Sequence, residues 1–170
     1  MAAKETVLVT GGSGFVGAWC IIAAIQQGYH VRSTIRSLKR TDEVRGFLTA
    51  GDLTEEQADS VEILPANLSS DDGWTEACKG CSYVLHVASP FPAGQPKHED
   101  DLIVPAREGT LRVLRAAKEA GSVKRIVVTS SVAAIGESPS EFISARRLTE
   151  CSVRSSQYGQ SLHRRRLDSP

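Results

Sequence analysis

The sequence predicts an α/β fold in which a doubly wound parallel sheet of five strands carries helices on both faces. Short β-branched runs alternate with helical stretches over residues 1–136. These runs are apolar without strict alternation, which is typical of parallel strands covered on both sides. The 170 residues are 41% hydrophobic and 24% charged, so the chain can form a globular domain with its own core.

The expected elements follow one another along the chain. We expect strands at Thr6–Thr10, His30–Arg36, Val61–Leu64, Ser82–Val87 and Arg125–Thr129. We expect helices at Phe15–Gln27, Thr41–Thr49, Asp72–Lys79 and Glu99–Ala120. Pro105 should either kink the last helix or mark its true start.

The composition changes after Gly136. Residues 137–170 are rich in Ser and Arg and poor in apolar side chains, which cannot offset the entropy of ordering. We therefore predict a dinucleotide-binding domain over 1–136 and a largely disordered polar tail over 137–170. The cluster Arg164-Arg165-Arg166 is interpreted as part of a solvated tail rather than as a nucleic-acid or localisation patch.

Charge and cysteine content argue against several function classes. The formal net charge is +0, which offers no attraction to nucleic acid or to an anionic membrane. The apolar stretch 15–25 is shorter than the ~20 residues that cross a bilayer. We expect a cytoplasmic protein with free thiols. The motif Cys78-x-x-Cys81 has no partner pair for zinc, so we expect packing there and no metal site.

A glycine-rich turn lies between the first strand and the first helix and carries the functional prediction. It consists of Thr10, Gly11, Gly12, Ser13, Gly14, Phe15, Val16 and Gly17. The spacing fits both G-x-G-x-x-G and G-x-x-G-x-x-G, and a strand before with a helix after is the context of a Rossmann-type dinucleotide site. Glycines there allow a tight turn, backbone approach to a pyrophosphate and close helix–strand packing. An ordinary glycine turn is the alternative.

The end of the second strand favours NADP(H) as the cofactor, with NAD(H) left open. Enzymes that use NAD usually place an acidic residue about 20 residues beyond the glycines. Here Arg36 takes that place, with Arg32, Lys39 and Arg40 around it. A guanidinium would bind a 2′-phosphate, whereas a carboxylate would repel it. A basic surface patch is the alternative.

With these motifs the chain resembles the extended short-chain dehydrogenases/reductases, in the dihydroflavonol reductase-like branch of the epimerase/dehydratase superfamily. The matching stretches are 9–17, 28–36, 79–90 and 127–131, within a likeness over about residues 5–136. The resemblance implies hydride transfer between a carbonyl and an alcohol on a small organic substrate. It also implies roles for individual residues: adenine contacts for Asn67 and Leu68, cofactor contacts for Val87, Ala88, Ser89, Thr129 and Ser130, and a catalytic serine at Ser131.

The sequence departs from this family in one respect that concerns catalysis. Members carry a Tyr followed four residues later by a Lys, which together move a proton at the substrate oxygen. The residues four places after Tyr29, Tyr83 and Tyr158 are Ser33, Val87 and Leu162. We therefore expect a chain truncated or misread after the fifth strand, without a substrate lobe and with impaired catalysis. The alternative function is a non-catalytic cofactor-binding remnant or regulatory module, and the long helix could pair two copies.

Overall fold

The computed structural model describes residues 4–90 and 98–131. The chain divides into two compact units, Met1–Thr129 and Ser130–Pro170, and only Ser130 and Ser131 of the second unit are described. The predicted disordered tail thus lies outside the described residues.

The first unit is an α/β sandwich built on one five-stranded sheet. Its strands are β1 (Thr6–Thr10), β2 (His30–Ile35), β3 (Glu62–Pro65), β4 (Tyr83–His86) and β5 (Arg125–Val128). All neighbouring strands pair in parallel, in the order β3-β2-β1-β4-β5. The predicted doubly wound parallel sheet is confirmed.

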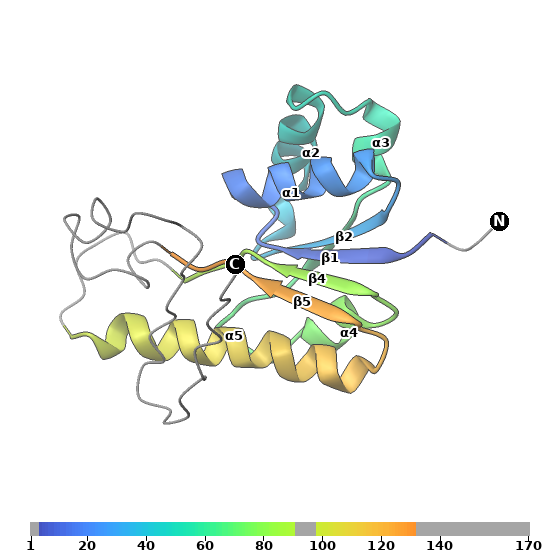
Figure 1. The fold of residues 1–170 in the computed structure, drawn as a ribbon. Coiled ribbons are helices and arrows are strands. Elements are labelled where there is room, and N and C mark those ends of the chain that lie inside the picture. Colours follow the sequence, from blue (N-terminus) through green and yellow to red (C-terminus); the bar gives the residue numbers. More distant parts are fainter. Residues whose placement is uncertain (1–3, 91–97, 132–170) are drawn as a thin grey trace, which may run out of the picture. The chain divides into compact units, whose positions relative to one another are not determined.

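Helices cover both faces of this sheet (Figure 1). The α-helices are α1 (Phe15–Gln26), α2 (Thr41–Ala50), α3 (Glu55–Asp59), α4 (Trp74–Cys78) and α5 (Asp100–Ala120), and a 3-10 helix, η1, spans Leu38–Arg40. Helices α1, α2 and α3 lie on one face, and α4 and α5 lie on the other.

Strand alternation divides the core into two clusters. Val7 and Val9 of β1 pack with Ile21 of α1 and Leu48 of α2, whereas Leu8 packs on the opposite face with Trp74 and Val113. Leu8, Val9, Ile21 and Leu48 are each fully buried. Because neighbouring residues of one strand point to opposite faces, the short run Val7-Leu8-Val9 contributes to both clusters.

The predicted elements are present, with bounds that differ by at most two residues. Of the two alternatives for Pro105, a helix start is wrong, because α5 begins at Asp100 and continues through Pro105. Helix α3 was not predicted. It is a single short segment held by a capping box, in which the Thr54 hydroxyl accepts from Gln57 N and the Gln57 side chain accepts from Thr54 N.

Candidate functional site

The predicted site residues of the first unit lie beyond the carboxyl ends of its parallel strands. Strand β2 pairs with one side of β1, and β4, followed by β5, lies on the other side of β1. Open α/β sheets bind their ligands outside the carboxyl ends of the strands where the strand order reverses in this way. The glycine-rich turn follows β1, and Val87 and Ala88 follow β4, so both segments lie at this point of reversal.

Three of the four glycines in the turn are required by the protein itself. Gly11 has a φ of +76°, and a Cβ there would lie 3.0 Å from the Ala88 Cα. A Cβ on Gly12 would lie 2.1 Å from the Ser33 Oγ, and one on Gly17 would lie 2.2 Å from the Gly11 carbonyl oxygen. These contacts bring β1, β2 and α1 together more closely than any side chain would allow.

Gly14 differs from the other three glycines. Its φ of −98° and ψ of 159° suit any residue. A Cβ there would meet only the Gly11 carbonyl oxygen, at 3.4 Å, which is an ordinary contact. Gly14 is exposed at the N-cap of α1, so its lack of a side chain leaves room toward solvent rather than toward the protein.

The first turn of α1 has uncapped N–H groups that could donate to an anion. No side chain caps the N-terminus of α1, and no acidic residue lies in its first turn. The N–H groups of a first turn have no intrahelical partner and carry the positive end of the helix dipole. The neighbouring Gly11 and Gly12 N–H groups are already used, since both donate to the Thr34 carbonyl oxygen at 3.0 and 3.1 Å.

The basic residues after β2 separate into different roles. Arg36 and Lys39 are exposed, and neither forms an ion pair within the described part of the chain. Arg40 is held by Glu43 through a bidentate pair at 2.6 and 2.7 Å. This pair raises the pKa of Arg40 and lowers that of Glu43.

Arg32 belongs to the structure of the sheet rather than to this group. Its Nη1 donates to the carbonyl oxygens of Glu76, Ala77 and Lys79, at the C-terminus of α4. Its Nε donates to the Glu62 carboxylate at 2.7 Å. These four contacts engage Nε and Nη1, so Arg32 caps α4 and joins it to β2 and β3.

The two residues predicted to contact adenine lie in the loop after β3. Asn67 is exposed, and its Oδ1 accepts a hydrogen bond from Ser69 N at 3.1 Å. Leu68 is half-buried against α5, where a Cβ on Gly109 would lie 2.9 Å from the Leu68 Cβ. Its carbonyl oxygen accepts from Arg112 Nη1. The loop is thus anchored through Leu68 and leaves the Asn67 side chain at the surface.

The remaining predicted residues follow β4 and β5. Val87 and Ala88 are half-buried and Ser89 is exposed. Thr129 extends the β5 pairing, because its N–H donates to the His86 carbonyl oxygen at 3.0 Å. Ser130 and Ser131 are exposed and belong to the second unit, so their predicted roles stay expectations. Tyr158, the tyrosine closest to the expected catalytic segment, lies outside the described residues.

A hydrogen-bonded pair at the ends of β1 and β4 was not predicted from the sequence. Thr10 and His86 are register partners and are almost completely buried. The Thr10 Oγ1 lies 2.8 Å from the His86 Nδ1 and accepts from Val87 N and Ala88 N. Burial lowers the pKa of His86. A histidine inside the apolar run Val84-Leu85-His86-Val87 is a signal that could have revealed this pair, because buried polar groups need partners.

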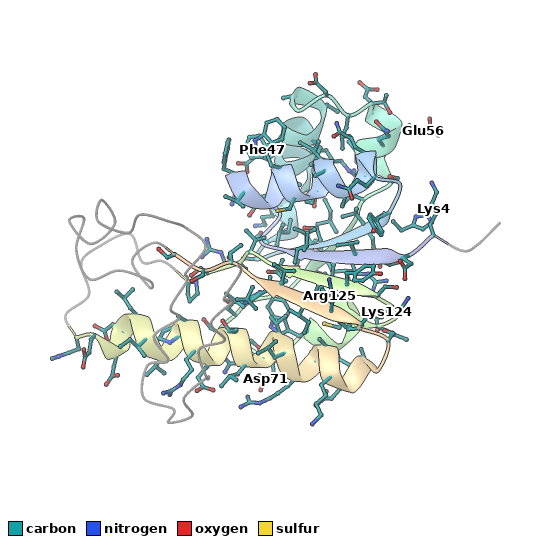
Figure 2. All side chains as sticks on the ribbon, viewed as in Figure 1. Lys4, Phe47, Glu56, Asp71, Lys124 and Arg125 are labelled. Atoms are coloured by element: carbon teal, nitrogen blue, oxygen red, sulfur yellow. The ribbon has the colours of Figure 1, made fainter. Side chains whose placement is uncertain are left out.

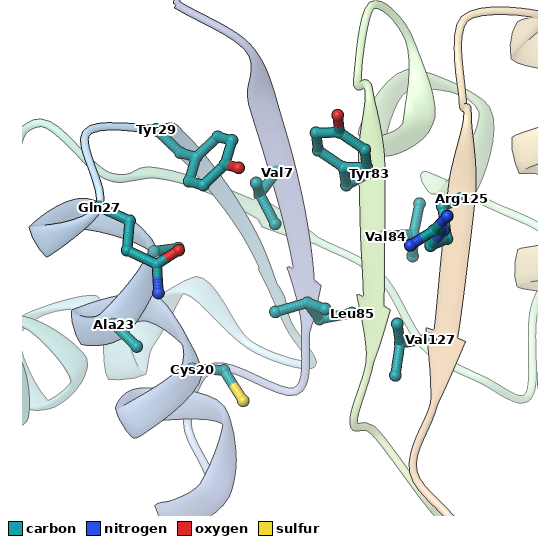
Figure 3. Close-up of a pocket in the computed structure, with 11 residues that line it drawn as sticks. Val7, Cys20, Ala23, Gln27, Tyr29, Tyr83, Val84, Leu85, Arg125 and Val127 are labelled. Carbon is teal, nitrogen blue, oxygen red and sulfur yellow. The ribbon is translucent and has the colours of Figure 1, made fainter.

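A concave feature of the structure is lined by other residues. A groove of about 430 Å³ runs between α1 and strands β4 and β5, with Tyr29, Tyr83, Leu85 and Val127 among its lining (Figure 3). None of the predicted site residues lines it. Cys78 and Cys81, by contrast, are fully buried in the core beside α4 and α5, as expected for packing.

Within residues 4–90 and 98–131, no three His, Cys, Asp or Glu side chains are grouped as metal ligands would be. No helix of this part of the chain combines the length and apolar character needed to span a bilayer.

The family follows from a comparison of the whole sequence with known proteins. Residues 7–163 match the NAD dependent epimerase/dehydratase family. The chain belongs to this family. The match extends past Gly136, where the sequence resemblance was expected to end.

Two plant reductases are among the similar relatives of this epimerase/dehydratase family chain. It is 41% identical over 132 residues to a dihydroflavonol 4-reductase of Hordeum vulgare, covering 78% of this chain and 36% of the relative. It is 34% identical to a Vitis vinifera anthocyanidin reductase, covering 78% of this chain and 38% of the relative. The chain therefore spans less than two fifths of the length of these relatives.

Solved structures agree with the fold. Vestitone reductase from alfalfa superposes with a TM-score of 0.59 at 30% identity, over 78% of this chain and 38% of that one. Yeast methylglyoxal/isovaleraldehyde reductase Gre2, in complex with NADPH, superposes with a TM-score of 0.63 at 27% identity, over 78% of this chain and 39% of that one.

Proposed function

We propose that the glycine-rich turn of this chain binds NADP(H), and that the chain supplies the cofactor-binding part of a reductase that interconverts a carbonyl and an alcohol. The similar proteins named above are reductases, and one of them was solved with NADPH. The family membership supports a nicotinamide dinucleotide as the ligand.

The observation that carries the proposal is the open space at Gly14. The protein requires glycine at positions 11, 12 and 17, but nothing in the protein requires it at position 14. A pyrophosphate that approaches the backbone at the N-terminus of α1 would require it, because a Cβ would occupy the space of the phosphate oxygens. The free first-turn N–H groups of α1 would donate to those oxygens.

The preference for NADP(H) over NAD(H) rests on Arg36 and Lys39. Both lie after β2, where the adenosine ribose of a bound dinucleotide is expected. Because neither has a carboxylate partner within the described residues, each is available to a 2′-phosphate. Arg40 would first have to leave Glu43, so we expect it to contribute less.

For the reaction, a bound NADPH would supply the hydride. Among the chain's own groups, the Ser131 hydroxyl would hydrogen-bond the substrate oxygen, as the family resemblance implies. No tyrosine of the sequence is followed by lysine at the fourth position, so the usual proton donor is missing. Its loss should lower turnover by roughly 10²–10⁴. Dinucleotide binding without appreciable turnover is therefore our second candidate function.

The test begins with Gly14→Ala and its matched control Gly46→Ala. Gly46 lies in α2, where a Cβ would meet nothing within 4 Å. We expect Gly14→Ala to keep its urea midpoint and to weaken NADPH binding, followed by fluorescence, by at least about tenfold. Gly46→Ala should bind as the unmodified chain does. Unchanged binding by Gly14→Ala would refute the proposed site.

The cofactor preference is tested with Arg36→Ala, titrated with NADPH and NADH. Arg115→Ala, an exposed arginine of α5 on the other face of the sheet, is the charge-matched control. We expect Arg36→Ala to reduce NADPH affinity about tenfold or more while leaving NADH affinity unchanged. Equal losses for both dinucleotides would contradict the assignment of Arg36. Assays with a panel of ketones and aldehydes then separate the reductase from the binding module.

A further inference from the structure

The hydroxyl of Thr10 is the centre of a buried network that joins β1 to the segment after β4. Val87 N and Ala88 N donate to Thr10 Oγ1 at 3.1 and 3.0 Å. The same oxygen lies 2.8 Å from His86 Nδ1. Thr10 is 0% exposed and His86 is 2% exposed, so water does not replace these contacts.

Counting protons assigns the state of His86. A threonine hydroxyl has one proton and two lone pairs. Both lone pairs accept from the two amides, so the proton must point to His86 Nδ1. Nδ1 is then an acceptor, and the imidazole is neutral with its proton on Nε2. Protonated His86 would present a second donor to a hydroxyl that has no lone pair left.

The network is connected to the glycine-rich turn through direct packing. Ala88 lies against Gly11, where a Cβ would come within 3.0 Å of the Ala88 Cα. The Gly11 carbonyl oxygen in turn lies against Gly17 of α1 and accepts from Gly14 N at 3.0 Å. Val87 and Ala88 thus form a wall behind the turn, and their hydrogen bonds to the Thr10 hydroxyl fix the position of this wall.

We propose that neutral His86 is a positioning residue of the dinucleotide site: it orients the Thr10 hydroxyl, which fixes the Val87–Ala88 wall behind the glycine-rich turn. Protonated His86 competes for a lone pair of Thr10 and releases one of the two amides, whereas loss of the acceptor leaves the Thr10 hydroxyl proton without a partner and its orientation unfixed. Either change weakens binding. This inference rests on the proposed function.

The surroundings of His86 leave burial as the cause of its lowered pKa. The buried positions of α5 on this face are Gly109, Val113, Ala116 and Ala117, none of which titrates. The buried titratable group of α4 is the Cys78 thiol, whose pKa burial raises to about 11, so it is uncharged, whereas Glu76 of α4 is exposed. From β5, Val128 and Thr129 follow the register of His86 and carry no charge. On β2, Arg32 is paired with Glu62.

The first experiment measures NADP⁺ binding by calorimetry at pH 7.5 and at lower pH, for the unmodified chain, His86→Asn and His86→Leu. Asparagine Oδ1 can accept the Thr10 proton in the place of Nδ1, whereas leucine cannot. At pH 7.5 we expect His86→Leu to bind about tenfold more weakly and His86→Asn to bind within about twofold of the unmodified chain. Equal affinity of all three at pH 7.5 would overturn the inference.

The pH dependence separates positioning from a general loss of structure. The 2′-phosphate of NADP⁺ itself titrates near pH 6, and His86→Asn retains that contribution. Once the pH has fallen from 7.5 through the lowered pKa of His86, the unmodified chain should therefore have lost about tenfold more affinity than His86→Asn. Parallel curves of NADP⁺ affinity against pH for the two proteins would show that protonation of His86 does not act on the site. That result would overturn the proposed effect of protonation.

Amide hydrogen exchange provides a test that needs neither a variant nor a ligand. The Val87 and Ala88 amides should be protected at pH 7.5 and should lose protection at low pH before the paired amides of β1 do. Loss of protection at the same pH in β1 and in the wall would contradict a local release. If NADP⁺ binds none of the proteins, the proposed function fails, and the exchange data alone decide the role of His86.

Discussion

Replacing Gly17 with alanine should destabilise the protein, although alanine is the better helix former. The third residue of α1 is Gly17, and a Cβ there would lie 2.2 Å from the Gly11 carbonyl oxygen, 2.9 Å from the Gly11 carbonyl carbon and 3.2 Å from the Gly12 Cα. These are backbone atoms, which cannot move aside as a flexible side chain would. An ordinary C···O contact needs about 3.3 Å, so α1 and the turn must separate by roughly 1 Å.

The expected magnitude follows from two opposing contributions. Alanine in place of glycine stabilises a helix interior by about 0.8–1 kcal/mol. Overpacking against atoms that cannot relax costs typically ~1–3 kcal/mol. For Gly17→Ala the second contribution should prevail, with a net loss of about 1–2 kcal/mol. At an m value of ~1–3 kcal/mol/M, the urea midpoint should fall by roughly 1 M.

Gly46→Ala is the matched control for this measurement. Gly46 lies within α2 and is exposed, and a Cβ added to it would meet nothing within 4 Å beyond its chain neighbours and the nearby backbone of its own helix. It should therefore gain about 0.8–1 kcal/mol from helix propensity alone. Both variants are followed by circular dichroism during urea unfolding. A Gly17→Ala midpoint equal to or above that of the unmodified chain would refute the argument from close backbone approach.

Three further predictions concern the rest of the domain. Leu48→Ala should lower stability by about 2–5 kcal/mol in urea unfolding, because Leu48 is fully buried; a loss below about 1 kcal/mol would contradict its place in the core. Val127→Lys should slow aggregation measured by light scattering, because Val127 is 51% exposed on β5, an edge of the described sheet; unchanged aggregation would count against this edge. The Glu5 carboxylate bonds to Lys124 and Tyr83, and these contacts lower its pKa below 4.5. The stability that Glu5 contributes should therefore be lost as the pH falls below about 4.5 and through the lowered pKa. Glu5→Gln should show a smaller loss of stability over that pH range.

The Glu5 contacts also join the starts of three strands. Glu5 precedes β1, Tyr83 begins β4, and Lys124 precedes β5, next to Arg125 (Figure 2). These contacts are at the amino ends of the strands, whereas the candidate site is at the carboxyl ends. Changes to Glu5 should therefore alter stability without altering dinucleotide affinity, which makes Glu5→Gln a useful reference for the site variants.

The sequence was sufficient to predict the sheet because each strand is a compact apolar run between turn residues. The segment Thr6–Thr10 has the predicted bounds, since a β-branched run that meets two glycines has few alternatives. Helix α3 escaped prediction because it is short and polar, and its capping box signal, Thr54 with Gln57, lacks the apolar run that usually accompanies it.

The basic residues near β2 show what sequence reasoning lacked at the site. Proximity in sequence grouped Arg32, Arg36 and Arg40, but their environments differ. Arg32 points to the face of the sheet that carries α4, where carbonyl oxygens accept hydrogen bonds from its Nη1. Arg40 has Glu43 three residues later, a spacing that pairs side chains on a helix and that was visible in the sequence. The availability of Arg36 became apparent only once the partners of the other two were known.

The two interpretations of the glycine spacing can be reconciled through the geometry of the turn. Gly11 provides the positive φ that reverses the chain after β1, and Gly12 lets β2 and α1 approach through Ser33 and Ile21. Gly17 allows α1 to rest on the Gly11 carbonyl. Both spacings therefore describe one turn, in which packing within the protein accounts for three glycines and leaves Gly14 for a ligand. If Gly14→Ala and Gly17→Ala lowered stability equally, this division of roles would be wrong, and the turn would be no more than a tight connection between β1 and α1.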